Sequence, residues 1–294
     1  TLLISSREMG QGVTTVLPQI AAEALGLDIS KVHVAPVDTA SSPYDKTTTS
    51  SRSTFHGGNA VLMAANEIKE QLLTLAAKHL GVPASEMEYV QGTMRYQKDH
   101  EKFIHINDVG KCGALKEQPS VIGSGSYSTG DIFSRPDLAT RQSKRPTVMW
   151  MFGAQAAEVE VDLGTGKIEL KTVSAAHDVG YAINPTGCLQ QIEGSIVMGL
   201  GHVLMEEMIY QNGELKNGNM VDYKVPTFMD SNVEMEITLL EKNHPEGPFG
   251  AKGIGEPGLA PVAAAIVNAT NAATGESFNS IPIKPEHILL RKGE

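Results

Sequence analysis

The sequence is poor in the residue types that build iron–sulfur centres and nucleic-acid surfaces. Its 294 residues include only two cysteines, Cys112 and Cys188, which are far apart and not at metal-ligand spacing. They could form a disulfide but do not require one, and an iron–sulfur cluster usually needs four. Aromatic residues make up 5%, and the net charge of −10 argues against a broad surface for nucleic acid or anionic membranes. No apolar run is long enough to span a bilayer. A chain of this length can bury one large core or two modest ones.

Patterns typical of helices and strands alternate along the chain. Helical periodicity predicts helices from about Val13 to a stop at Gly26, over 59–80, over roughly 189–208, and after Pro257 to about Ala273. Hairpins are expected at Gln91-Gly92, between 148–162 and 168–173, and at Asn212-Gly213, with strands at 1–5, 32–34, 121–128 and 235–240. Strands that meet through hairpins favour an α+β fold with mixed sheets and packed helices. We expect two α+β subdomains, 1–140 and 141–294.

The segment Lys252-Gly253-Ile254-Gly255-Glu256-Pro257 is the most informative stretch. Pro257 suits the first turn of a helix, so Glu256 is expected at that helix's N-terminus, in a loop with little side-chain bulk. A carboxylate held there can act as a general base if it is desolvated. The alternative is that it only stabilises the positive end of the helix dipole.

The same residues fit the dinucleotide-binding pattern Gly253-x-Gly255-x-x-Gly258. That pattern needs a preceding strand, because its first glycine makes the turn from strand to helix. The preceding residues 243–250 are typical of a loop. A nicotinamide-dependent dehydrogenase is therefore the weaker interpretation.

Three loops rich in glycine or hydroxyl side chains lie next to predicted helix starts. They are Gly10-Gln11-Gly12, the run 47–54 and the run 190–194. Gln11 offers two donors and one acceptor, and the backbone and hydroxyl groups of 47–54 can hold a phosphate, with Arg52 as a counter-charge. When each loop is taken alone, an ordinary polar loop, a helix cap or helix–helix packing is the favoured explanation.

Five motifs in one order resemble the C-terminal half of the molybdenum-binding region of the xanthine oxidase and aldehyde oxidoreductase family. The resemblance covers nearly the whole chain. The motifs are Glu8-Met9-Gly10-Gln11-Gly12, Thr48 to Ser53 with Gly58-Asn59-Ala60, Asp178-Val179-Gly180 with Asn184-Pro185, Gln191-Ile192-Glu193-Gly194, and Lys252 to Pro257.

The resemblance implies the molybdopterin-binding fold and a role for each matched position. Glu256 matches the catalytic glutamate, and no protein side chain is expected to bind the metal. The implied reaction hydroxylates an electron-poor carbon of a purine-like N-heterocycle or an aldehyde, with water as the oxygen source and Glu256 as general base. The expected contacts of the molybdenum–pyranopterin, which can carry a cytosine nucleotide, are Met9, Gly10, Gln11, Thr49, Ser50, Ser51, Arg52, Ser53 and Gln191.

Much of the family pattern has no counterpart in this sequence. The other half of the molybdenum-binding region, the iron–sulfur clusters and the FAD module are expected on partner subunits, and the chain is expected to be one subunit or a fragment. The first residues carry no signal peptide and no initiator Met, so processing or truncation before Thr1 and a cytoplasmic location are expected. A non-catalytic cofactor-binding or assembly subunit is the alternative, although Glu256 is present.

Overall fold

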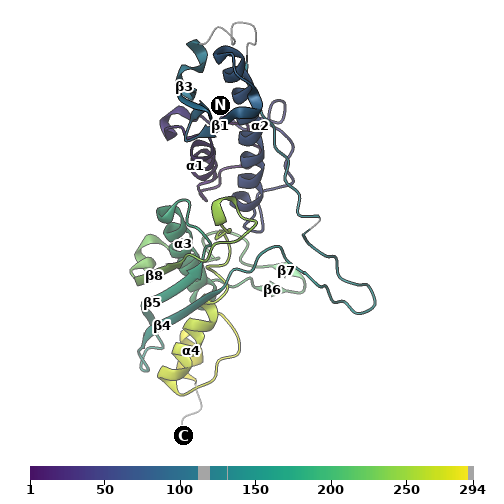
Figure 1. Ribbon diagram of the computed structural model, residues 1–294. Coiled ribbons are helices and arrows are strands. Elements are labelled where there is room, and N and C mark those ends of the chain that lie inside the picture. Colours follow the sequence, from purple (N-terminus) through teal and green to yellow (C-terminus); the bar gives the residue numbers. More distant parts are fainter. Residues whose placement is uncertain (112–119, 131, 291–294) are drawn as a thin grey trace. The chain divides into compact units, whose positions relative to one another are not determined.

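The computed structural model describes residues 1–111, 120–130 and 132–290, and Cys112 lies outside them. Helices, strands and two compact units of an α+β fold are shown in Figure 1. The main elements, in chain order, are α1 (Val13–Leu25), the π-helical turn η2 (Ser53–Gly57), α2 (Gly58–Leu80), β1 (Met87–Val90), β2 (Thr93–Tyr96), β3 (Asp99–His105), β4 (Gly153–Val161), β5 (Ile168–Asp178), α3 (Pro185–Leu204), β6 (Tyr210–Gln211), β7 (Glu214–Leu215), β8 (Glu234–Leu240), α4 (Val262–Thr274) and α5 (Pro285–Leu289). Short 3-10 turns, among them η7 (Pro248–Gly250), connect several of these. No helix among the described residues is long and apolar enough to cross a membrane.

The chain divides into two compact units. The first comprises residues 1–150 and 243–253, and the second comprises 151–242 and 254–294. The division into subdomains 1–140 and 141–294 that we expected from the sequence stays a prediction. Residues 243–253 return to the first unit, so this unit is built from two stretches of sequence.

The first unit packs α1 and α2 together and adds the antiparallel sheet β1-β2-β3. The helices form where they were predicted, because their apolar residues recur at helical spacing and glycine in the left-handed conformation ends each one, Gly26 after α1 and Gly81 after α2. The apolar side of α2 packs on the sheet through a cluster that includes Leu72, Met87 and Met94. Strands β1 and β2 form the predicted hairpin, with Val90 opposite Thr93.

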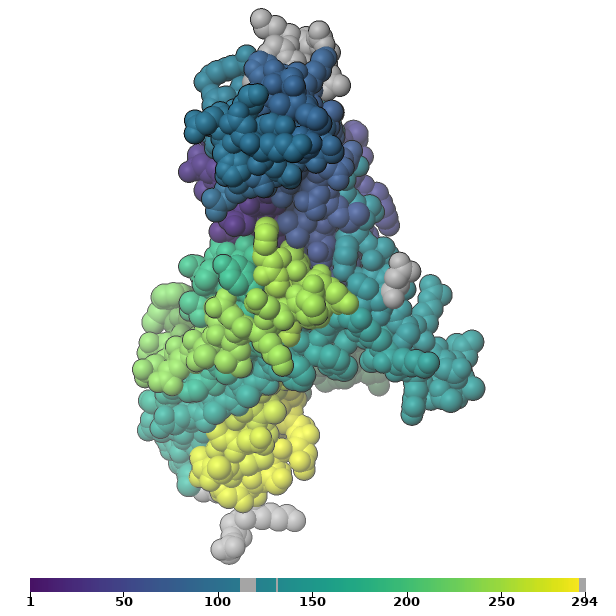
Figure 2. All heavy atoms as spheres, viewed as in Figure 1, coloured from purple at the N-terminus to yellow at the C-terminus, as the bar shows by residue number. Residues whose placement is uncertain are grey.

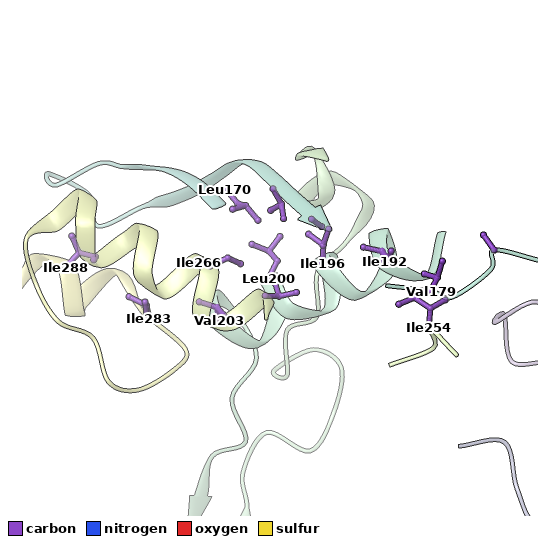
Figure 3. Close-up of a cluster of buried hydrophobic side chains, with 14 residues drawn as sticks. Leu170, Val179, Ile192, Ile196, Leu200, Val203, Ile254, Ile266, Ile283 and Ile288 are labelled. Atoms are coloured by element: carbon purple, nitrogen blue, oxygen red, sulfur yellow. The ribbon is translucent and has the colours of Figure 1, made fainter. Parts of the chain in front are cut away.

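The second unit is a three-stranded sheet, β4-β5-β8, packed on helices α3 and α4. Strand β4 pairs antiparallel with β5, and β5 pairs parallel with β8. Figure 3 shows the buried cluster that these elements share, with Ile192, Val179 and Ile254 at one end of it. Helix α4 packs against β4, and it belongs to the C-terminal stretch coloured yellow in Figure 2. The core therefore fixes Ile192 and Ile254, the neighbours of Gln191 and Gly255.

Several predictions about the strands were wrong. The stretches 1–5 and 32–34 form only one bridge, between Leu2 and Val34. The stretch 121–128 forms no strand and lies along α2, so close that a Cβ on Gly125 would be 1.8 Å from the carbonyl oxygen of Ala60. The hairpin strand predicted at 168–173 runs on to Asp178, and β3 was not predicted.

Two predicted helix starts were also wrong. Helix α3 begins at Pro185, not near Leu189, because the Asn184 side chain accepts a hydrogen bond from Gly187 N (2.9 Å) and Pro185 occupies the first turn. It ends at Leu204, short of the predicted Met208. Helix α4 begins at Val262, five residues after Pro257.

Candidate functional site

The turn before α1 is built around the carboxylate of Glu8, which sequence reasoning missed. Its Oε1 accepts hydrogen bonds from Gly10 N and Gly12 N, both at 2.9 Å, and its Oε2 accepts from Thr14 N and Thr14 Oγ1 at 3.0 and 2.8 Å. Desolvation raises the pKa of Glu8, but these hydrogen bonds outweigh it and lower the pKa to about 2. The sequence did contain a signal for this role: Glu8 lies shortly before α1, and the residue at the N-cap of α1, Gly12, has no side chain to cap the helix.

Glycine is required at both Gly10 and Gly12 by conformation. Their φ angles are +99° and +81°, and a Cβ on either would meet no atom within 4 Å. A side chain there would be strained although it has room. The space beside both α-carbons is therefore open, while both N–H groups are bonded to Glu8.

Gln11 uses much of its amide inside this turn. Its Oε1 accepts a hydrogen bond from Met9 N (2.6 Å), and its Nε2 donates to Arg7 O (2.7 Å). The side chain of Met9 is 69% exposed. One N–H of the Gln11 amide and the exposed backbone of the turn are what this segment can offer to a ligand.

The polar loop before η2 contains two consecutive serines in the left-handed region, Ser50 with φ +55° and Ser51 with φ +50°. Such angles are uncommon for residues other than glycine, and they persist where surrounding structure enforces them, often at functional sites. The loop is tied to the first turn through Thr48, whose Oγ1 accepts a hydrogen bond from Arg7 N (3.1 Å).

Arg52 stabilises this loop through an ion pair. Its guanidinium Nη1 lies 2.6 Å from Asp45 Oδ1 and 2.9 Å from Thr47 O. Ser6 Oγ donates to the other oxygen of Asp45 at 3.2 Å. Desolvation raises the pKa of Asp45, and the hydrogen bond from Arg52 with its charge brings the pKa below the usual value. The charge of Arg52, expected as a counter-charge for phosphate, is already compensated by Asp45.

The first part of the Lys252–Pro257 motif packs against the same loop. A Cβ on Gly253 would lie 1.8 Å from Ser51 O, so no other residue fits without a backbone shift. Lys252 is 8% exposed and its Nζ donates to Trp150 O at 2.8 Å. The first unit thus brings together the Gln11 turn, the Ser51 loop and Gly253.

The second unit brings Gln191 and the Glu256 loop together. Gln191 lies six residues into α3, not at its start, and its Nε2 donates a long hydrogen bond to Gly255 O (3.4 Å). Ser195 Oγ donates to Gln191 O (2.8 Å), and a Cβ on Gly258 would lie 2.9 Å from that Oγ. The loop around Glu256 therefore lies directly against α3.

Glu256 is exposed, and it is not at a helix N-terminus as predicted. Residues 255–261 form turns, in which Leu259 N donates to Glu256 O (3.1 Å), and α4 starts only at Val262. A helix dipole acts within the first turn of its helix. The dipole explanation for Glu256 therefore loses its structural basis.

The dinucleotide interpretation lacks the strand that it needs. The residues before Gly253 form a turn and the 3-10 segment η7, and the preceding strand, β8, ends at Leu240. Among the residues that the structure describes, no three His, Cys, Asp or Glu side chains are placed to hold a metal ion. What the candidate loops offer is backbone groups, amides, hydroxyls and exposed carboxylates, Glu256 among them.

A family model and two similar proteins match this chain over most of its length. The family model of the molybdopterin cofactor-binding domain matches residues 1–232. The chain is 30% identical over 290 residues to the xanthine dehydrogenase molybdenum-binding subunit of Escherichia coli O157:H7, over 96% of this chain and 36% of that protein. It is 31% identical over 293 residues to the nicotine 6-hydroxylase large subunit of Paenarthrobacter nicotinovorans, over 98% of this chain and 35% of that protein.

A solved structure gives the same fold. The quinoline 2-oxidoreductase of Pseudomonas putida 86 superimposes with a TM-score of 0.80 at 26% identity, over 98% of this chain and 36% of that chain. The chain thus spans about a third of the length of these relatives. The matched family model, the shared fold and the ordered motifs agree: this chain belongs to the molybdopterin cofactor-binding domain family, as the molybdenum-binding part of the xanthine oxidase type.

Proposed function

We propose that this chain is part of a molybdenum hydroxylase in which it binds the molybdenum–pyranopterin and supplies Glu256 as the general base. One observation carries the proposal. The segment Lys252–Pro257 places Gly253 against the backbone of Ser51 and, three residues later, presents an exposed carboxylate in a loop that is not a helix N-terminus. Its position in a short, tightly packed segment suits a carboxylate that must be held in place for proton transfer.

The residues present fit an anionic pterin cofactor. The left-handed Ser50 and Ser51 curve the main chain as it is curved in sites that bind phosphate and other anions. Gln11 donates one amide hydrogen to Arg7 O and keeps the other, and the space beside the α-carbons of Gly10 and Gly12 is open. We assign the contacts to Met9, Gly10, Gln11, Thr49, Ser50, Ser51, Arg52, Ser53 and Gln191, with a cytosine dinucleotide as one form of the cofactor. When bound, the molybdenum–pyranopterin supplies the redox centre that takes up two electrons from the substrate.

Glu256 would move the proton. Hydroxylation converts a C–H bond and one water into a C–OH bond, with release of two electrons and two protons. A Glu256 carboxylate oxygen accepts one proton from the water-derived oxygen as this oxygen attacks the electron-poor carbon. Such base catalysis contributes about 10²–10⁴-fold. The exposure of Glu256 in this chain leaves the carboxylate accessible to a reacting group.

The substrate class that we propose is a nitrogen heterocycle. The names of the similar proteins refer to xanthine, nicotine and quinoline, all of which carry carbons made electron-poor by a neighbouring ring nitrogen. An aldehyde is the other class, because a structure of an aldehyde oxidoreductase from Desulfovibrio gigas also matches at 26% identity.

We propose that the remaining parts of the enzyme accompany this chain. They are the other half of the molybdenum-binding region, an iron–sulfur subunit and an FAD subunit. Size-exclusion chromatography and mass spectrometry of native extract should find the chain with larger partners, or as part of a longer polypeptide. An active isolated monomer would contradict the proposal.

The complete enzyme provides the test of function. We expect molybdenum and pterin to copurify with it, and we expect turnover of purines or other N-heterocycles with oxygen from ¹⁸O-labelled water in the product. An assembly protein would bind the cofactor without turning over any member of an N-heterocycle and aldehyde panel.

A further inference from the structure

Two polar side chains occupy core-facing positions of the β4–β5 hairpin. Along β4, Gln155 lies on the same face as Ala157 and Val159, which pack on the hydrophobic cluster. Along β5, His177 follows Val173 and Ala175 on the buried face and is only 1% exposed. Alternation places apolar residues at such positions, so the two polar residues require an explanation.

Gln155 connects the hairpin to the loop that follows Glu256. Its Nε2 lies 2.8 Å from Gly258 O and 2.9 Å from His177 Nε2. A carbonyl oxygen only accepts hydrogen bonds, so the atom facing it must be the amide NH₂ group. His177 Nε2 must then accept the second amide hydrogen, which places the ring proton on Nδ1 and makes the imidazole neutral. Burial lowers the pKa of His177, which favours the same neutral form.

The strand pairing makes room for this histidine. The register places Gly153 directly opposite His177, and a Cβ on Gly153 would lie 2.4 Å from His177 Nδ1. Any other residue at position 153 would displace the ring. Gly153 thus leaves room for His177, His177 accepts a hydrogen bond from Gln155, and Gln155 donates a second one to Gly258 O.

The arrangement leaves two polar atoms buried without a hydrogen bond, Gln155 Oε1 and His177 Nδ1. Buried unpaired polar atoms cost stability, and an apolar pair of similar shape would avoid that cost. An apolar pair could not make the hydrogen bond from Gln155 Nε2 to Gly258 O, which only the polar pair provides. From helix α3, Gln191 Nε2 donates a longer hydrogen bond, 3.4 Å, to Gly255 O of the same loop.

We propose that Gln155, oriented by His177, is a positioning residue that fixes the backbone at Gly258 and thereby the placement of the Glu256 carboxylate, two residues away. This inference rests on the proposed role of Glu256 as general base. Neither Gln155 nor His177 need touch the substrate. Misplacement of a reacting group by about 1 Å can cost about 10²-fold in rate, so the loss of one loop hydrogen bond is expected to reduce turnover measurably.

The test is a double-mutant cycle in the complete enzyme. Gln155→Met keeps the size of the side chain and removes the donor, and Glu158→Met, on the exposed face of the same strand, is the matched control. We expect Gln155→Met to lower kcat about 10–100-fold with KM nearly unchanged and with molybdenum content retained, as a misplaced base would. In a Glu256→Gln background the same change should have less than a threefold effect, because the group that it positions is already inactive.

A second measurement does not depend on turnover. Hydrogen–deuterium exchange of the peptide covering 254–261 should become faster in Gln155→Met and remain unchanged in Glu158→Met. If Gln155→Met loses molybdenum, Gln155→Leu, which is also apolar and has no donor, gives the same comparison.

The outcomes separate this inference from the proposed function. If Glu256→Gln is impaired but Gln155→Met turns over normally, or lowers turnover equally in both backgrounds, the positioning role is wrong and the proposed base stands. Unchanged exchange at 254–261 also overturns the positioning role. If Glu256→Gln turns over normally at full molybdenum content, the proposed base fails and the positioning role fails with it.

Discussion

At the scale of single residues, the polar side chains beside the candidate positions mainly hold the backbone in place. Glu8 accepts four hydrogen bonds within its own turn, and Arg52 pairs with Asp45. The candidate contacts are then backbone groups whose positions depend on these side chains. A substitution at Glu8 should therefore change both the stability of the turn and its capacity to bind a ligand.

The first prediction concerns Glu8→Ala. Loss of an N-terminal cap costs about 0.5–2 kcal/mol, so the free energy of unfolding at pH 7 should fall by that amount. Because folding lowers the pKa of Glu8 from 4.5 to about 2, its stabilising contribution is present above pH 4.5 and is lost as the pH falls toward 2. Denaturant unfolding between pH 7 and pH 3 measures this.

The wild-type chain should lose more stability over that range than Glu8→Ala does. Glu23→Ala, an exposed acid on α1, is the control and should resemble the wild type. Parallel pH profiles for wild type and Glu8→Ala would show that the turn does not depend on the ionised carboxylate.

The second prediction concerns His177. Its pKa is lowered by burial below the ordinary value of 6.5, so protonation opposes folding, and stability present above pH 6.5 is lost as the pH falls below it. In His177→Gln the new amide oxygen can still accept the hydrogen bond from Gln155, and this side chain does not become charged between pH 7 and pH 5. His177→Gln should therefore reduce the loss of melting temperature between pH 7 and pH 5, whereas His79→Gln, at an exposed site on α2, should not.

At the scale of elements, the sequence predicted what local patterns determine. Helices α1 and α2, with their glycine stops, and the β1–β2 and β6–β7 hairpins follow from periodicity and turn residues. The start of α3 was misplaced because its cap, Asn184, lies before the apolar stripe. The start of α4 was misplaced because Pro257 fits a tight turn as well as a first helical turn.

The candidate site was predictable only in part. Glycine-rich motifs indicated the turns at Gly10 and Gly253, because such backbone leaves a sequence signature. The left-handed Ser50 and Ser51, the pairing of Arg52 with Asp45 and the link from Gln155 to Gly258 depend on tertiary packing, which no local pattern reports. These are the contacts that decide which atoms face a ligand.

The third prediction concerns the loop before η2. Ser51 has a φ of +50°, which glycine adopts readily and proline, fixed near −65°, cannot. Ser51→Gly should retain molybdenum, whereas Ser51→Pro should lose most of it, because the loop backbone must rearrange against Gly253. Elemental analysis of the purified complete enzyme, with thermal unfolding to check the fold, measures both. Full molybdenum content in Ser51→Pro would identify the loop as a connection only.

At the scale of the whole chain, the candidate residues are shared between the two units. Gln11, Ser51 and Gly253 belong to the first, and Gln191 and Glu256 to the second. The chain spans about a third of the length of its relatives. Activity is therefore a property to be measured in the complete enzyme, where all the proposed contacts are present.

The most direct test of the central claim is single-turnover reduction of the complete enzyme carrying Glu256→Gln, at matched molybdenum content. The amide keeps the shape of the side chain and cannot accept the proton. We expect a rate about 10²–10⁴-fold lower than wild type, with molybdenum content and melting temperature unchanged. A near-normal rate at full molybdenum content would contradict the assignment of Glu256 as the general base.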